Sequence, residues 1–250
     1  MNAIQAINLK NDLKYWKDEF TRFMMSYKFA LDELNTKIDI LKQEFQYMHE
    51  YNPIEHVKSR LKSPESILKK LNKKGLEISF SSIKENIKDI AGIRITCSFL
   101  SDIYEIAEML QKQQDIKVVS VKDYIKNPKE NGYKSLHLIL QIPVFMSDRV
   151  EDVGVEVQIR TIAMDFWASL EHKIYYKYNG KVPETLVNEL KTAAYTANSL
   201  DRKMEAIHKE MALIKETNSN EDQLKIDENN IIPSDLLKNL SIRLNGITKE

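Results

Sequence analysis

Residues 153–160 read Val-Gly-Val-Glu-Val-Gln-Ile-Arg, an alternation of apolar and polar side chains. In a β-strand alternate side chains share a face, so the valines and Ile159 point one way and Glu156, Gln158 and Arg160 point the other. A carboxylate, an amide and a guanidinium in one row suit an active-site floor. The alternative is the solvated face of an antiparallel sheet. The stretch therefore predicts a half-buried strand with a candidate site on its polar face.

Outward from this strand the chain divides into further strands and helices. Alternating or β-branched runs predict strands over 90–99, 118–125 and 136–142. Apolar residues at three- and four-residue steps predict helices over 5–50, 102–112, 163–177 and 184–215. Strands interleaved with helices imply an α+β fold, a mixed β-sheet of about five strands with helices packed against it and helical extensions at both ends.

Three units follow from this order. Residues 1–52 form an N-terminal helical extension that ends at Asn52-Pro53, residues 53–180 form the core, and residues 181–250 hold C-terminal helices and a polar tail. Within the tail, 216–227 predicts a flexible linker, and a short helix is expected after Pro233. The long amphipathic helices carry more apolar surface than one small core buries, so we expect a homo-oligomer.

Composition excludes several classes of protein. Lys and Arg (37) balance Asp and Glu (37), whereas a dedicated nucleic-acid binder is usually basic, so RNA binding has no support. A lone Cys97 in an apolar run rules out a disulfide within the chain, fits the reducing cytosol and indicates packing. The charged first twenty residues are unlike a signal peptide, and no run of about 18 apolar residues predicts a membrane span. We therefore expect a cytoplasmic protein.

A basic loop is predicted between the strands 118–125 and 136–142. The dipeptides Asn127-Pro128 and Asn131-Gly132 are typical of turns, which places Lys126, Lys129 and Tyr133 on or beside the loop. Lysines suit phosphates and a tyrosine ring suits stacking on a base, so the loop is a candidate nucleotide site. An ordinary solvated connection is the alternative.

A helix N-terminus is predicted at Ser63-Pro64, because serine is a good N-cap and proline fits the first helical position. Arg60 and Lys62 then lie just before the helix, where free backbone N–H groups favour an anion. Ser66 falls in the first turn and Lys70 one turn further on. The alternative is a surface helix whose lysines extend into solvent.

A further acid, Asp89, precedes the strand 90–99, in which Gly92 would let another group approach the backbone. Asp89 could simply cap the strand. With Glu156 it could instead hold magnesium, which prefers one or two carboxylates together with phosphates and waters. Sequence spacing leaves open whether the two acids meet.

Taken in order, these stretches resemble the synthetase domain of the RelA/SpoT-type alarmone synthetases. The resemblance covers residues 50–180. Its motifs are Arg-x-Lys-x-x-x-Ser-Ile from Arg60, Asp-Ile-Ala-Gly-Ile-Arg at 89–94, Lys-Asp-Tyr-Ile at 122–125, Asn-Gly-Tyr-x-Ser-Leu-His at 131–137 and Val-Glu-Val-Gln-Ile-Arg-Thr at 155–161. The block Ala-Met-Asp-Phe-Trp-Ala-Ser-Leu-Glu-His at 163–172 is similar to the small, single-domain branch.

The resemblance implies a role for each matching residue. Asp89 and Glu156 would bind Mg²⁺, and Glu156 would also be the general base. The implied ATP ligands are Arg60 and Arg94 around adenine and Lys62, Ser66 and Lys70 on the phosphates. The implied GTP or GDP ligands are Tyr133 stacked on guanine, Lys122, Lys129 and His137 on the phosphates, and Asn131, Gln158 and Arg160 in support.

The implied reaction moves a diphosphate from ATP to the 3′-hydroxyl of GTP or GDP and yields pppGpp or ppGpp plus AMP, as in the bacterial stringent response. No His-Asp dipeptide occurs, so we expect synthesis without hydrolysis. The small branch also implies a homotetramer that needs no ribosome.

Two other classes of protein remain as alternatives. A polymerase-β-type nucleotidyltransferase would show Gly-Ser followed by Asp-x-Asp, and the chain has neither. A non-catalytic sensor that binds a guanine nucleotide or RNA would have little need for both Asp89 and Glu156.

Overall fold

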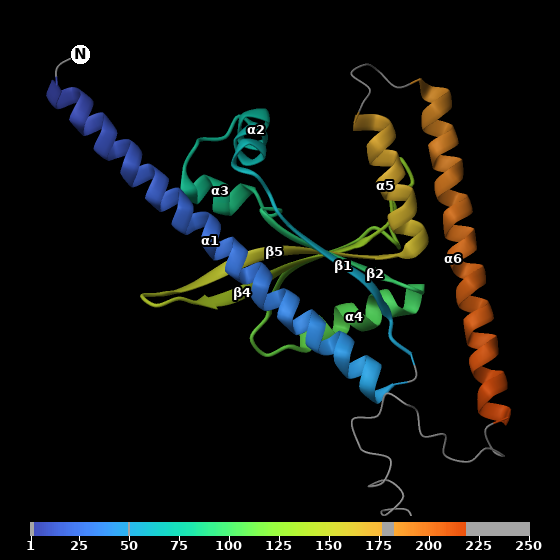
Figure 1. Cartoon of the computed structure of the whole chain (residues 1–250). Coiled ribbons are helices and arrows are strands. Elements are labelled where there is room, and N and C mark those ends of the chain that lie inside the picture. Colours follow the sequence, from blue (N-terminus) through green and yellow to red (C-terminus); the bar gives the residue numbers. More distant parts are fainter. Residues whose placement is uncertain (1–2, 50, 177–182, 219–250) are drawn as a thin grey trace, which may run out of the picture.

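The computed structural model describes residues 3–49, 51–176 and 183–218. A five-stranded sheet runs through its centre in the order β1-β2-β5-β4-β3 (Figure 1). β2 and β5 are parallel and the other neighbours are antiparallel, which confirms the predicted α+β fold with a mixed sheet. The strands are β1 (Ile54–Leu61), β2 (Ala91–Cys97), β3 (Lys117–Asp123), β4 (Leu136–Phe145) and β5 (Val150–Thr161).

Helices pack on this sheet and beside it. The long first helix runs along the sheet and contacts four of its strands, and the last two helices lie against each other at one end (Figure 1). The helices are α1 (Ala3–Met48), α2 (Pro64–Lys74), α3 (Phe80–Asn86), α4 (Leu100–Lys112), α5 (Ile162–Tyr176) and α6 (Glu184–Asn218). None of these described helices has both the length and the apolar character that crossing a membrane requires.

The register of the sheet separates a core face from a polar face. Val153, Val155, Val157 and Ile159 of β5 are buried and join the apolar side chains of β4, α1 and α4 in one cluster. On the other face, Gly92 of β2 lies opposite Glu156, Arg94 lies opposite Gln158, and His137 of β4 also pairs with Gln158. The alternation predicted for residues 153–160 is confirmed, and strands distant in sequence extend its polar row.

Two elements were not predicted. β1 is a mostly exposed edge strand in which only Ile54 is fully buried, so no hydrophobic period marks it. Short α3 is held by Phe80, whose ring packs on Trp16, Phe20 and Phe23 of α1. Arg60 therefore stands on a strand and not in a connection before α2.

The C-terminal prediction needs one correction. α6 continues to Asn218, so residues 216–218 are helical and do not begin a linker. A helix gains one backbone hydrogen bond for each residue it adds, so polar residues can extend it once it is nucleated. The rest of the predicted linker and the helix after Pro233 lie outside the described residues.

Candidate active site

A cavity of about 270 Å³ lies over the polar face where β1, β2 and β5 meet, lined among others by Arg60, Arg94 and Glu156. The Arg60 side chain packs over the backbone of residue 92, since a Cβ added at Gly92 would lie 3.6 Å from Nε of Arg60, an ordinary van der Waals distance. A guanidinium therefore lies beside Gly92, at a distance that an added Cβ would also tolerate. Two arginines thus flank a space above the Glu156 strand.

The N-terminus of α2 follows directly after β1, whose residue Arg60 lines this cavity. Ser63 caps the helix, since its Oγ accepts a hydrogen bond from the backbone N–H of Ser66 at 3.3 Å, and Pro64 follows as predicted. The backbone N–H of Lys62 donates to the carbonyl of Ile90 at 2.8 Å, which fastens the entry of α2 to the entry of β2. This bond brings the Lys62 side chain to the neighbouring Asp89.

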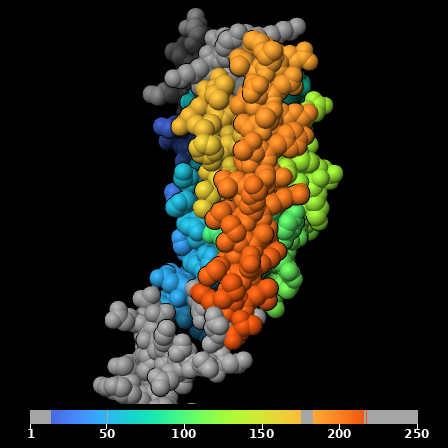
Figure 2. All heavy atoms as spheres, turned by 90° about the vertical axis from the view of Figure 1, so that its right-hand side faces the viewer, coloured from blue at the N-terminus to red at the C-terminus, as the bar shows by residue number. Residues whose placement is uncertain are grey.

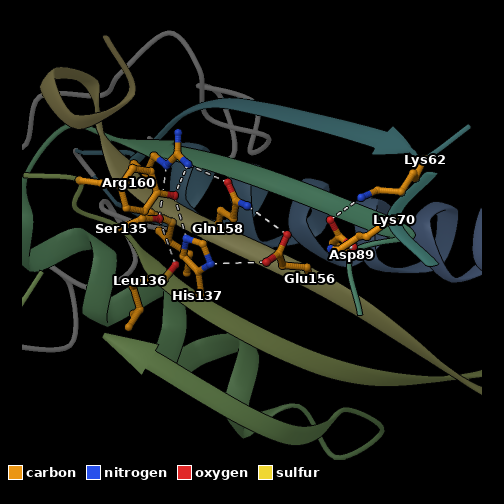
Figure 3. A network of polar contacts seen from close by, with 11 residues as sticks. Lys62, Lys70, Asp89, Ser135, Leu136, His137, Glu156, Gln158 and Arg160 are labelled. Atoms are coloured by element: carbon orange, nitrogen blue, oxygen red, sulfur yellow. Dashed lines mark hydrogen bonds and ion pairs between the residues drawn. The ribbon is translucent and has the colours of Figure 1, made fainter. Parts of the chain in front are cut away.

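Asp89 is bracketed by two lysines (Figure 3). Nζ of Lys62 lies 2.5 Å from Oδ2 and Nζ of Lys70 lies 2.7 Å from Oδ1. Burial alone would raise the pKa of Asp89, but the hydrogen bonds and charges of the lysines outweigh burial and lower the pKa. The acid is therefore ionised, and two cations are concentrated around it next to the entry of β2.

Glu156 stands next along the same face. His137 Nδ1 lies 3.4 Å from its Oε1, and Nε2 of Gln158 donates to its Oε2 at 3.0 Å. Burial and the negative charge of Asp89 both raise the pKa of Glu156. The contacts with His137 and Gln158 lower this pKa by more, so the net shift is downward. Figure 3 shows Asp89 and Glu156 on the same side of the sheet. The two acids, 67 positions apart in the sequence (156 − 89), therefore share one site.

The loop between β3 and β4 closes the far end of the row. The hydroxyl of Tyr133 lies 2.8 Å from Nε2 of His137 and also accepts from Arg160. Nζ of Lys129 stands 4.6 Å from the centre of the Tyr133 ring. Lys122 of β3 pairs with His137 in the strand register. These residues, predicted for one substrate, gather in one place.

Asn131 of the same loop faces helix α5. Its Nδ2 donates to Oε1 of Glu171 at 3.1 Å, and its Oδ1 accepts from the backbone N–H of Tyr133 at 3.2 Å. Asn131 therefore shapes the loop and links it to α5.

Two residues outside the predicted set of ligands stand beside the site. Asp165, in the first turn of α5, pairs with both Arg94 and Arg160. Trp167 is buried, donates from Nε1 to the carbonyl of Leu190 at 2.9 Å, and packs beside Tyr133. Both lie within the block 163–172 directly after the Glu156 strand, and this proximity was the available signal.

The arrangement of Asp89 and Glu156 can be compared with what a magnesium site requires. Across the described ranges no group of three or more His, Cys, Asp or Glu side chains is arranged to hold a metal ion. Mg²⁺ does not need such a cage, because one or two carboxylates suffice when nucleotide phosphates and waters complete the octahedron. Asp89 and Glu156 fit this pattern, provided that Lys62 and Lys70 move from Asp89 to the incoming phosphates.

Comparison with known proteins agrees with this geometry. Residues 59–181 match the family described as a region found in RelA / SpoT proteins. The chain is 56% identical over 204 residues to GTP pyrophosphokinase YwaC of Bacillus subtilis, which covers 82% of this chain and 95% of that protein. It is 39% identical to GTP pyrophosphokinase YjbM of the same organism, covering 80% and 92%.

Solved structures agree as well. Small alarmone synthetase 2 from Bacillus subtilis superimposes with a TM-score of 0.69 at 56% identity and covers 78% of this chain and 98% of that one. Small alarmone synthetase 1 from Bacillus subtilis, bound to its product pppGpp, gives a TM-score of 0.73 at 39% identity and covers 78% and 99%. Fold and site thus define the class as that of the RelA/SpoT synthetases. Because these relatives match over nearly their whole length, the chain belongs to the small alarmone synthetases of that family.

Proposed function

We propose that this chain transfers the diphosphate of ATP to the 3′-hydroxyl of GTP or GDP, producing pppGpp or ppGpp and AMP. The observation that carries the proposal is that Asp89 and Glu156 lie on one face of the sheet, where Glu156 lines the arginine-lined cavity and Gln158 and Arg160 continue the polar row from Glu156 (Figure 3). Two structures of one relative, small alarmone synthetase 1 from Bacillus subtilis, support it, one described as bound to pppGpp and the other as bound to AMPCPP.

The donor nucleotide occupies the cavity over β1 and β2. Arg60 and Arg94 suit adenine, because planar guanidinium groups stack on aromatic rings. The triphosphate then reaches Lys62, Ser66 and Lys70 at the α2 N-terminus, where the positive end of the helix also favours an anion. Phosphate oxygens replace the Asp89 carboxylate as partners of the two lysines.

The acceptor nucleotide binds at the β3–β4 loop. Tyr133 offers its ring to guanine, while Lys122, Lys129 and His137 offer cationic or donor groups to the phosphates. Asn131 shapes the loop, and Gln158 and Arg160 hold Glu156 and Tyr133 in position, each by hydrogen bonds.

The chemical step is an in-line displacement. The 3′-oxygen attacks the β-phosphorus, the bond from that phosphorus to the bridging oxygen of the α-phosphate breaks, and AMP leaves with that oxygen. Glu156 accepts the hydroxyl proton. Because a carboxylate with a lowered pKa is a weak base, the proton moves late, after the new bond has begun to form. Mg²⁺ held by Asp89 and Glu156 would neutralise negative charge on the phosphates, and the lysines would neutralise more of this charge.

Labelled ATP, GDP and Mg²⁺ test the proposal directly. AMP together with a 3′-pyrophosphorylated nucleotide supports it, whereas binding of both nucleotides without turnover indicates a sensor. Glu156→Gln should abolish turnover and spare most binding. The matched control is Glu151→Gln on the same strand. Glu151 accepts a hydrogen bond from Arg149 at 2.8 Å and is not part of the site, so its replacement should leave turnover intact.

We also propose a homotetramer assembled through the C-terminal helices, with residues 1–52 and 181–250 as extensions of a 53–180 core. Figure 2 shows α5 and α6 side by side along one face. Both helices expose apolar side chains at three- and four-residue steps, a pattern that marks an interface. The exposed residues are Ile162, Phe166, Leu170 and Ile174 of α5 and Leu200, Met204, Ile207, Met211 and Ile214 of α6.

Light scattering at micromolar concentration tests the assembly, and a monomeric mass would exclude it. Ile207→Glu should lower the mass if α6 forms the interface. Glu210→Gln, an exposed position on the same helix, is the control that should leave the mass unchanged.

The chain, in this proposal, acts in the cytoplasm, where ATP and GTP are available, and performs synthesis alone without a ribosome. Turnover by the purified chain in the absence of ribosomes is the expected result. Release of pyrophosphate from ppGpp in the presence of Mn²⁺ would contradict a purely synthetic enzyme.

A further inference from the structure

One carboxylate lies between two arginines at the centre of the site. Oδ1 of Asp165 is 3.2 Å from Nη1 of Arg94 and 3.3 Å from Nη1 of Arg160. The side chains of Asp165 and Arg160 are 19% and 4% exposed, so solvent screens their contact little, whereas Arg94 is 34% exposed and its contact with Asp165 is screened more. A single oxygen atom therefore holds two guanidinium groups together.

The two arginines belong to different halves of the site. Arg94 lines the cavity assigned to ATP. Arg160 donates to the hydroxyl of Tyr133 and, at 2.8 Å, to Oε1 of Gln158, both on the side assigned to the guanine nucleotide. The path from Arg94 through Asp165 and Arg160 to Tyr133 is continuous, and each step is an ion pair or a hydrogen bond.

The charges explain why Asp165 is needed at this point. Arg94 and Arg160 repel each other, and the pKa of Arg94 is lowered first by burial and then by the charge of Arg160. Nε of Arg94 is buried with no hydrogen-bond partner among the described residues, so the contact at Nη1 aligns its guanidinium. Without the carboxylate, Arg94 would lose the contact that orients it, whereas Arg160 would keep its hydrogen bonds to Ser135, Tyr133 and Gln158 and lose its link to Arg94.

We propose that Asp165 is a positioning residue that couples the ATP side to the guanine-nucleotide side, so that each nucleotide binds more tightly when the other is present. The inference rests on the proposed function for the identity of the two ligands. A nucleotide stacked on Arg94 fixes that guanidinium, which fixes Asp165, Arg160 and the Tyr133 ring before the second nucleotide arrives. Linkage makes the effect reciprocal, since each ligand must change the affinity of the other by the same factor.

Binding measurements on the full chain test this coupling. The dissociation constants of a non-hydrolysable ATP analogue and of GDP are measured alone and with the other ligand saturating. In the wild type we expect each ligand to tighten the other by about tenfold, within the usual range of such couplings. In Asp165→Asn both ligands should bind more weakly and the coupling factor should fall to within about twofold of unity. Asp165→Glu, which restores a carboxylate, should recover part of it.

The matched control is Glu171→Ala on the same helix. Glu171 reaches Asn131 of the acceptor loop, so its loss should weaken GDP binding and leave the coupling factor unchanged. Circular dichroism checks the fold of each variant, and Asp165→Ser replaces the asparagine variant if that one unfolds.

A wild-type coupling factor of one, or full coupling in a folded Asp165 variant, would overturn the inference. A coupling factor that falls in Glu171→Ala as much as in Asp165→Asn would also overturn it, because a general loosening of α5 would then explain the loss of coupling. Failure of the proposed function is a separate result: the wild type would bind both nucleotides, with or without coupling, and form no AMP.

Discussion

Replacing Gly132 by alanine should distort the acceptor loop, because the new Cβ would collide with Cβ of Ala194. Gly132 has a backbone φ of +88°, and a Cβ at this position would lie 2.6 Å from Cβ of Ala194 on α6. Carbon atoms attract best at about 3.5–4.0 Å, so this contact is strongly repulsive. The loop can pass this closely along α6 only because residue 132 has no side chain.

Two costs add up in Gly132→Ala. A left-handed backbone costs an L-residue about 1–2 kcal/mol, and forcing a methyl group into a packed contact costs about 1–3 kcal/mol. Gly75→Ala is the matched control, because Gly75 has a φ of +64° and a Cβ added there would meet nothing within 4 Å. We expect the free energy of unfolding to fall by about 2–5 kcal/mol in Gly132→Ala and by only about 1–2 kcal/mol in Gly75→Ala.

Urea unfolding and steady-state kinetics measure the two variants. Because the loop carries Lys129 and Tyr133, Gly132→Ala should also raise the KM for GDP several-fold while the KM for ATP changes little. The double variant with Ala194→Gly should show favourable coupling in a double-mutant cycle, since the second change removes the methyl group that collides. Equal losses of stability in Gly132→Ala and Gly75→Ala, or no coupling to position 194, would refute the packing argument.

Two further predictions concern buried polar groups. Burial raises the pKa of Asp201, so the native state binds this proton more readily than the unfolded state does, and the free energy of unfolding should decline as pH rises from about 4 through the raised pKa. Asp201→Asn keeps an acceptor for Thr161, now 2.7 Å away, and should remove that decline in urea unfolding at a series of pH values; an unchanged pH profile would contradict the assignment. Tyr133→Phe keeps the ring but loses the hydroxyl contact to His137, so GDP should bind within a few-fold of wild type, whereas Tyr133→Ala should lose more than about tenfold, in line with the value of a stacked base. Equal losses in the two Tyr133 variants would exclude stacking.

Local patterns identified most of the fold. β4 and β5 alternate buried and partly exposed residues along nearly their whole length, so the two-residue period is visible in the chain itself. The Ser63-Pro64 start of α2 was equally clear, because a helix cap depends on adjacent residues. β1 escaped prediction because pairing with β2, and not its own burial, holds it in the sheet.

The candidate site was likewise only partly predictable from the sequence. Residue types and the turn at Asn131-Gly132 marked the acceptor loop, and burial of Cys97 followed from its apolar neighbours. The partners of the charged residues did not follow, since Asp89 meets Lys62 and Lys70 only after β1, α2 and β2 have been arranged. The contact between Gly132 and Ala194 likewise joins a loop to a helix that begins more than fifty residues later.

The amino-acid sequence by itself determined the strands and helices other than β1 and α3, the polar side of β5, and the acids and bases that this polar side carries. Only the tertiary structure decided that β2 lies parallel to β5, and this pairing brings Asp89 to Glu156 and places Arg94 where Asp165 can join it to Arg160. The physical reason is one of range. Periodicity and capping depend on neighbours within a few residues, whereas strand pairing and ion pairs depend on which distant surfaces the buried core brings together.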